Sequence, residues 1–266
     1  NGNGLAIATT DSNPIRFGTN GTDRMRIDSS GRVGIAGTPP AWGAAYANIN
    51  IGNTGALWGS KSAASLTALS DNSYHNGSAS IARNTGAGSL YSMSSGGHTW
   101  ATFASVSAGA TQTEVARMRI DSEGRVTMPS QPAFKVAWSS RNSTGADRIL
   151  STNNSDSVTT GRDEFNTGSH FSAATGRFTA PVAGTYLLGF QGMRNGNNGA
   201  SLECRIKKNG GVIWARAYRS SFNNSHEYWS IATNTKCAAG DYFEVLIGAN
   251  TSIYNDDTYF YGHLIG

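Results

Sequence analysis

The stretch FSAATGRFTAPVAGTYLLGF, residues 171–190, decides the fold. From Tyr186 to Phe190, large apolar side chains occupy every second position, and this period of two is typical of a strand with one buried face. Thr175-Gly176 supplies turn chemistry, because glycine accepts a positive φ without steric cost. Pro181 has no amide donor and therefore favours a strand end or an edge. The stretch predicts a strand, a short loop and a second strand within an all-β domain.

The rest of the C-terminal half repeats this pattern of short strands and turns. Its apolar runs are about ten residues apart, and turn residues such as Asn209-Gly210-Gly211 separate them, which predicts a β-sandwich. The alternating runs contain Phe134, Val136 and Trp138; Leu202, Cys204 and Ile206; Val212, Ile213 and Trp214; Tyr228, Trp229 and Ile231; and Phe243, Val245 and Ile247.

The same half of the chain also carries a family resemblance. Phe171, followed by GRFTAPVAGTY at residues 176–186, resembles the globular head of complement component 1q and its tumour-necrosis-factor-like relatives. Gly240–Val245 resembles the penultimate strand of that family and Phe260–Ile265 its closing strand, whereas Leu188 stands where the family usually has an aromatic residue. The resemblance covers about residues 132–266 and implies a ten-strand jelly roll that assembles as a trimer and binds ligands.

A decapeptide repeat marks the N-terminal half. Arg24–Val33 reads RMRIDSSGRV, and 93 residues later Arg117–Val126 reads RMRIDSEGRV. Each copy predicts a strand, a tight Asp-Ser-x-Gly turn and a second strand, and a single hairpin of this kind is marginally stable alone. Three chains wrapped about one axis would bury the apolar side chains of the first copy, which predicts a fibrous trimer. These side chains are Met25, Ile27, Val33 and Ile35.

This repeat, followed by Gly34-Ile35 and Pro39-Pro40, resembles one that is common in bacteriophage tail fibres and related virion appendages. In the second copy Thr127-Met128-Pro129 replaces the Gly-Ile pair, which we interpret as the end of the fibre. Residues 41–116 are rich in Gly, Ser, Ala and Asn but carry regularly spaced aromatic residues; a flexible linker is the alternative interpretation.

The predicted architecture is therefore all-β, with a trimeric fibrous β shaft followed by a C-terminal jelly-roll β-sandwich head. Residues 1–40 form the first shaft repeat, and residues 41–128 form a Gly/Ser-rich β shaft that contains the second repeat. Residues 129–266 form the head that resembles complement component 1q.

Composition excludes several classes of protein. The net charge is +4, and no run of Lys and Arg is longer than Lys207-Lys208, so nucleic acid is not an expected partner. No apolar run approaches the ~20 residues of a membrane span, so membrane insertion is not expected. We expect Cys204 and Cys237 to be reduced, buried thiols; a disulfide between them is the alternative.

The sequence offers little for catalysis. None of the five histidines has a zinc-ligand spacing, and no nucleophile elbow is present. Glycoside hydrolysis needs two carboxyl groups that face each other across a bond, whereas the adjacent pairs Asp163-Glu164 and Asp256-Asp257 point apart in a loop. We therefore expect no enzymatic activity, no catalytic residue, no metal and no cofactor. A calcium ion at Asp256-Asp257 is the alternative, because hard cations prefer clustered oxygens.

Sugar binding combines aromatic platforms with Asn, Asp and Arg side chains, and two stretches of the head are rich in both. The alternative is that Trp214, Tyr218 and Trp229 belong to the core or to a trimer axis. The predicted glycan-binding residues are Trp214, Arg216, Tyr218, Arg219, Asn223, Asn224, His226, Tyr254, Asp256 and Asp257.

These patterns predict a phage tail fibre, or receptor-binding protein, that attaches the virion to a host cell-surface polysaccharide or lipopolysaccharide without catalysis. The expected assembly is a homotrimer in the virion, formed in the host cytoplasm, with repeated weak sites that multiply avidity. The start at Asn1 suggests a missing N-terminal part that joins other virion tail proteins. The alternatives are a secreted complement-like or lectin-like recognition module, a polysaccharide-cleaving tailspike, and a purely structural tip.

Overall fold

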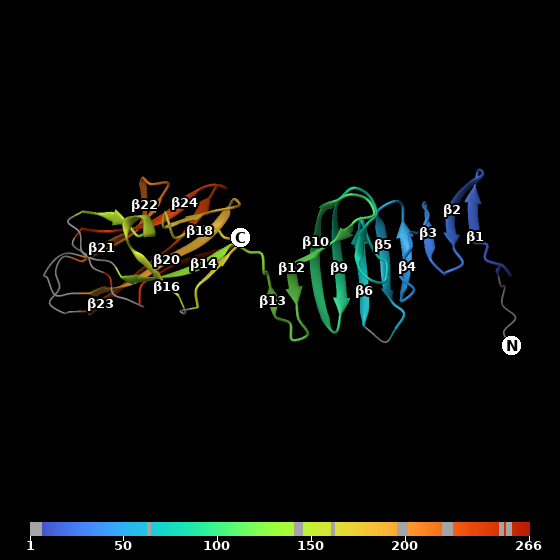
Figure 1. The fold of residues 1–266 in the computed structure, drawn as a ribbon, viewed down its shortest axis with the longest axis horizontal. Coiled ribbons are helices and arrows are strands. Elements are labelled where there is room, and N and C mark those ends of the chain that lie inside the picture. Colours follow the sequence, from blue (N-terminus) through green and yellow to red (C-terminus); the bar gives the residue numbers. More distant parts are fainter. Residues whose placement is uncertain are drawn as a thin grey trace. The chain divides into compact units, whose positions relative to one another are not determined.

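The regular structure of the protein is almost entirely β-strand. The computed structural model describes residues 7–62, 65–140, 146–160, 163–195, 202–219, 226–249, 253 and 257–266. Apart from one 3-10 turn, η1 (Thr152–Asn154), the regular structure of these residues is β, so the predicted all-β class is correct. No helix in these ranges has the length and hydropathy to cross a membrane. The chain divides into two compact units, Asn1–Pro129 and Ser130–Gly266 (Figure 1).

A large sheet and a small sheet make up the first unit (Figure 1). The large sheet has ten strands, and its neighbouring strands are antiparallel except β3 and β4, which run parallel. In sheet order it comprises β1 (Ile15–Thr19), β2 (Thr22–Ile27), β3 (Val33–Ile35), β4 (Tyr46–Ile51), β5 (Gly55–Ser60), β6 (Leu66–Asp71), β9 (Gly86–Ser94), β10 (Gly97–Val106), β12 (Glu114–Ile120) and β13 (Val126–Thr127). The small sheet comprises β11 (Thr111–Gln112), β8 (Ser80–Ala82) and β7 (Ser73–His75).

One face of the large sheet packs on a small aromatic core. Ala56, Trp58 and Ala68 point to this face, and Trp42, from the segment between β3 and β4, packs against them. Tyr74 of β7, a strand of the small sheet, also packs against this core. The Asn76-Gly77 dipeptide turns the chain between β7 and β8, which pair with each other.

The opposite face of the large sheet carries exposed apolar side chains. Residues that pair directly across neighbouring strands share one face of a sheet, and a continuous line of such pairs crosses the unit from β3 to β12. We call this line the apolar row. Leu69, near its middle, is 53% exposed. The apolar row consists of Val33, Ile49, Leu57, Leu69, Tyr91, Trp100 and Met118.

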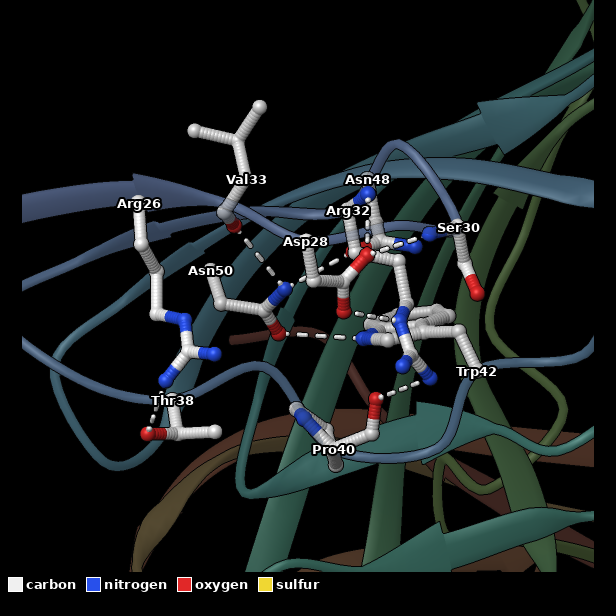
Figure 2. Close-up of polar contacts among 10 residues, drawn as sticks. All are labelled: Arg26, Asp28, Ser30, Arg32, Val33, Thr38, Pro40, Trp42, Asn48 and Asn50. Atoms are coloured by element: carbon white, nitrogen blue, oxygen red, sulfur yellow. Dashed lines mark hydrogen bonds and ion pairs between the residues drawn. The ribbon is translucent and has the colours of Figure 1, made fainter. Parts of the chain in front are cut away.

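The two copies of the decapeptide adopt the same turn. In the first copy, the Asp28 carboxylate accepts hydrogen bonds from the backbone N–H groups two and four residues later and from Nε of Arg32 (Figure 2). In the second copy, Asp121 accepts the same three bonds, with Arg125 in the place of Arg32. A glycine with positive φ follows each aspartate by three residues.

The second unit is a sandwich of two antiparallel sheets (Figure 1). The first sheet contains β16 (Ser157–Thr159), β14 (Ala133–Ser140), β25 (Tyr259–Leu264), β20 (Gly184–Asn195) and β23 (His226–Cys237), and β17 (Phe165–Thr167) also pairs with β14. The second contains β18 (Phe171–Ser172), β19 (Arg177–Thr179), β24 (Tyr242–Ile247), β21 (Leu202–Lys208) and β22 (Val212–Arg219), and β15 (Arg148–Ile149) pairs with β24.

The stretch at residues 171–190 contributes to both sheets. Phe171 pairs with Phe178 in the β18–β19 hairpin, whose turn contains Thr175-Gly176, whereas β20 begins after Pro181 and lies in the other sheet. The two sheets meet in a core of aromatic side chains, in which the Phe134 and Phe178 rings stack at 4.6 Å between centroids. The largest fully buried side chains of the unit are Trp138, Tyr186, Phe134, Phe178, Phe190, Phe243 and Phe260.

Both cysteines are free and buried in this core, as expected. Burial raises the pKa of the Cys204 thiol to about 12. Trp229 lies beside Cys204 and donates from Nε1 to its sulfur, so the interpretation of Trp229 as a core residue is correct.

Candidate functional site

The edge strand β22 presents the predicted aromatic residues to solvent. Ala215 and Ala217 pack against the core, and because side chains alternate along a strand, Arg216 and Tyr218 point outward. Trp214 lies at an irregularity in the pairing of β22 with β21 and is exposed as well. Trp214 is 42% exposed and Tyr218 is 56% exposed. In the single chain these two aromatic residues are therefore surface residues and not core residues.

Charged side chains from β21 and β22 form a network of ion pairs in the middle of this surface. Glu203 of β21 accepts a hydrogen bond of 2.6 Å from Nε of Arg205 and also forms an ion pair with Arg216. Arg205 reaches on to Asp147, at 3.2 Å. The hydrogen bonds from Arg205 lower the pKa of Glu203 most strongly, and both arginines add to the effect, so the carboxylate stays ionised.

Cations lie over both exposed rings. Nζ of Lys208 lies 5.4 Å from the Trp214 ring centroid, and the guanidinium carbon of Arg216 lies 5.2 Å from that of Tyr218. Both distances are within the range of cation–π attraction. Lys208 also pairs with Asp241 at 2.6 Å. We call this region, formed by Trp214, Arg216, Tyr218, Lys208, Glu203 and Arg205, the β22 surface.

The β22 surface combines two recognition elements. The rims and free faces of Trp214 and Tyr218 offer apolar contact, and Arg216 offers N–H donors that recognise hydroxyl, carboxylate or phosphate oxygens. An oxygen-rich ligand with an apolar ring face matches this combination.

Among the other predicted glycan-binding residues, the structure describes the side chain of Asp257. Asp257 accepts a hydrogen bond of 3.4 Å from the exposed Tyr228 hydroxyl, and Tyr228 belongs to β23 of the other sheet. Arg219 and His226 are described only by their backbone, at the end of β22 and the start of β23. Asn223, Asn224, Tyr254 and Asp256 lie outside the described residues.

The expectation that no metal is bound stays a prediction, with calcium as its alternative. Among the residues that the structure describes, no group of three His, Cys, Asp or Glu side chains is placed to hold a metal ion. The calcium alternative depended on Asp256 as well as Asp257, and Asp256 is not among those residues.

Sequence reasoning found Arg216 but missed Glu203, Arg205 and Lys208 of the β22 surface. Glu203 and Arg205 alternate with the buried Cys204 and Ile206, so their outward direction could have been read from the period of two. Their ion pair with Arg216 depends on the pairing of β21 with β22, which the sequence does not state.

Comparisons with known proteins address the second unit. Residues 142–265 match the sequence model of the C1q domain. The globular domain of zebrafish complement 1qA protein is 20% identical, with 51% of this chain and 98% of that chain covered and a TM-score of 0.38. Murine APRIL is 15% identical, with 50% and 99% covered and a TM-score of 0.38. No curated protein sequence matches the chain.

Residues 142–265 are therefore similar to the C1q domain, in agreement with the resemblance expected for this part of the chain. Domains of this class are typically non-enzymatic recognition modules and typically form trimers.

Proposed function

We propose that the chain is a homotrimeric attachment protein of the bacteriophage tail-fibre type. In this proposal the C1q/TNF-like head binds a host cell-surface polysaccharide or lipopolysaccharide without catalysis, and the first unit is a shaft. The observation that carries the proposal is the apolar row, an exposed hydrophobic line on a chain whose other unit resembles a trimer-forming class of domain.

The apolar row needs a partner. Soluble monomers rarely expose large contiguous apolar patches, and this sheet already buries its other face against Trp42 and Tyr74. We assign the row to two further copies of the same chain. Trimer formation by the head would bring three rows together and so raise their local concentration. A repeated RMRID hairpin at Arg24–Val33 and Arg117–Val126, with Met25 and Ile35 paired in the first copy, fits a shaft built by repetition.

The β22 surface is the proposed glycan site. A pyranose ring presents an apolar face that can contact Trp214 or Tyr218, while Arg216 donates to hydroxyl or acidic groups of the sugar. Each trimer would carry three such sites, and several trimers on a virion would multiply weak individual affinities into firm attachment.

The match to the C1q domain equally supports one alternative, a secreted complement-like or lectin-like recognition module. The repeat in the first unit favours the fibre. The two functions differ in the cells that they recognise, so a cell-binding experiment separates them.

The test is a pull-down of the fluorescently labelled protein on bacterial cells, before and after removal of their surface polysaccharide. We expect retention that is lost on removal and is reduced at least tenfold by Trp214→Ala combined with Tyr218→Ala. Phe165→Ala is the control, since Phe165 is a similarly exposed aromatic residue of the other sheet. Retention that survives the double substitution would exclude the β22 surface. Retention that survives removal of the polysaccharide would exclude a glycan receptor.

Two further outcomes choose between functions. Retention by animal cells and by none of the bacterial cells would select the secreted module. Release of reducing ends from bacterial polysaccharide would contradict attachment without catalysis and select the tailspike.

A further inference from the structure

The turn between β7 and β8 brings a backbone nitrogen, an imidazole base and a side-chain amide together. It spans residues 76–79, and a hydrogen bond of 3.1 Å from the Asn76 N–H to the carbonyl oxygen of Ala79 closes it. Asn76 and Gly77 are exposed, so water reaches both residues. In an asparagine–glycine pair the backbone nitrogen of glycine can attack the asparagine amide with little steric hindrance, because glycine has no side chain.

The side-chain amide of Asn76 is held beside the nitrogen of Gly77. Its Oδ1 accepts hydrogen bonds of 2.9 Å from the N–H groups of Ser78 and Ala79. The ring that the Ser78 bond closes contains the Gly77 nitrogen, so this bond folds Cγ of Asn76 back toward that nitrogen. Two N–H donors on one carbonyl oxygen also stabilise the negative charge that the oxygen gains when a nucleophile adds to Cγ.

His75 supplies a base for the attacking nitrogen. Its Nδ1 accepts a hydrogen bond of 3.1 Å from the Gly77 N–H, so the neutral ring carries its proton on Nε2. Burial lowers the pKa of His75, which favours the neutral ring. The ring lies 5.0 Å from that of Tyr46, and the His75 carbonyl oxygen accepts a bond of 2.9 Å from the Gly43 N–H. These contacts hold the base in position before any reaction begins.

Two other asparagine–glycine turns of the chain provide a comparison. Asn20-Gly21 joins β1 to β2, and Asn209-Gly210 lies between β21 and β22. Within the described part of the chain, neither Gly21 nor Gly210 donates its N–H to a side chain. The three turns therefore share one dipeptide, and only the turn after His75 combines it with a base.

We propose that Asn76-Gly77 is a site of self-catalysed deamidation, in which the folded turn accelerates the reaction. The Gly77 nitrogen forms a bond to Cγ of Asn76 and gives its proton to Nδ1 of His75. The bond from Cγ to Nδ2 then breaks, Nδ2 takes the proton from the imidazolium and leaves as ammonia, and a cyclic succinimide remains. Water opens the succinimide at either of its carbonyl carbons and gives aspartate or isoaspartate. One water is consumed and one ammonia is released, with no change in oxidation state.

The modification would weaken the small sheet. Either product adds a negative charge to the turn, and isoaspartate also adds a methylene group to the main chain. A longer main chain conflicts with the register of β7 against β8, in which His75 pairs directly with Ser80. Because Tyr74 of β7 packs against the aromatic core, the reaction would slowly and irreversibly loosen one side of that core as the protein ages.

The test incubates the full chain at neutral pH and follows each asparagine by peptide mass spectrometry, in which deamidation adds one mass unit. We expect Asn76 to react at least tenfold faster than Asn20 and Asn209 in the same sample. It should also react faster in the folded chain than in a synthetic peptide of residues 72–80, which contains the same histidine without the folded turn.

Two variants test the base itself. His75→Phe keeps a ring beside Tyr46 but removes Nδ1, and we expect the Asn76 rate to fall about tenfold or more, since a positioned general base typically contributes at least that much. His98→Phe removes the other histidine of the first unit and is the matched control, which should react as wild type. In His75→Ala, free imidazole should raise the Asn76 rate more than the Asn20 rate, a response that a purely structural histidine would not give.

The proposal is overturned by any of three results. Asn76 might be the wrong residue, in which case it reacts no faster than Asn20 and Asn209. The folded turn protects the amide if the synthetic peptide reacts faster than the full chain. His75 is not the base if His75→Phe deamidates at Asn76 as fast as wild type.

Discussion

Nε of Arg32 lies 2.6 Å from the Asp28 carboxylate, and this pair closes the turn between β2 and β3. The side chains of Asp28 and Arg32 are 13% and 24% exposed. The matching pair, Asp121 and Arg125, has the same 2.6 Å separation, but its side chains are 39% and 71% exposed. One sequence motif therefore forms one turn in two environments, and the difference in burial provides an internal control.

Asp28→Asn should lower the free energy of unfolding of the first unit by about 1–2 kcal/mol, because an amide nitrogen cannot accept the bond from Arg32. Asp121→Asn should have a smaller effect, since solvent screens that exposed pair. Urea unfolding followed by tryptophan fluorescence measures both. Equal losses in the two variants would contradict a role for burial.

The acid sensitivity of the second unit should depend on Asp241. Hydrogen bonds from Lys208, and then from the Asn209 side chain and the Ala238 N–H, lower the pKa of Asp241 to about 2. A lowered folded-state pKa stabilises the fold above the unfolded value, near 4, and this contribution disappears as the pH falls towards 2. We expect the difference in Tm between wild type and Asp241→Asn to shrink over this range. A difference that is constant from pH 5 to pH 2 would refute this linkage.

Leu69→Lys should disrupt the proposed trimer of the first unit, because it places one charge per chain in the middle of the apolar row. Sedimentation velocity at micromolar concentration should show a loss of trimer or a marked fall in its stability. Asn53→Lys, in the exposed turn between β4 and β5, adds the same charge outside the row and should leave assembly intact. A wild-type chain that sediments as a folded monomer would refute the trimer itself.

Gly176→Ala should destabilise the second unit by about 3 kcal/mol or more. Gly176 has a φ of +70°, and a Cβ there would lie 1.8 Å from the carbonyl oxygen of Leu150. The left-handed backbone alone costs roughly 1–2 kcal/mol for an L-residue, and the steric overlap adds to this cost. Gly211→Ala meets no atom within 4 Å and should be nearly neutral. Thermal unfolding of the two variants provides the comparison.

Both thiols should resist labelling in the native protein. Burial raises the pKa of Cys204 to about 12, and burial also raises the pKa of Cys237, so little thiolate forms at pH 8. A disulfide reagent should react with neither thiol in native buffer within minutes and with both in guanidinium chloride. Rapid, stoichiometric labelling of the native chain would show that the core around Cys204 opens readily.

Much of the fold could be predicted because the local signals are strong. The alternation from Tyr186 to Phe190 identified a half-buried strand, and Gly176 identified a turn that only a residue tolerant of positive φ can occupy. The assignment of β19 and β20 to different sheets was not predictable, because periodicity shows which face is buried and not which strand lies alongside.

The candidate sites could be predicted only in part for the same reason, because the sequence does not show which strands lie side by side. Composition pointed to Trp214, Arg216 and Tyr218, but the placement of the β21 side chains beside them follows from the register of β21 against β22, which shifts between Ile206 and Lys207. The Asn76-Gly77 dipeptide indicates a hairpin turn, but the hydrogen bond between Gly77 and His75 is seen only once the chain is folded.

Strand β25 occupies the centre of its sheet, with β14 on one side and β20 on the other. It is the last strand of the head to leave the ribosome, yet Phe260 contributes to the middle of the core. Until it arrives, β14 and β20 present unpaired edges with no central strand between them. A polypeptide that ends before Tyr259 lacks this central strand and cannot form the complete sandwich. Only full-length heads would therefore fold and be able to assemble.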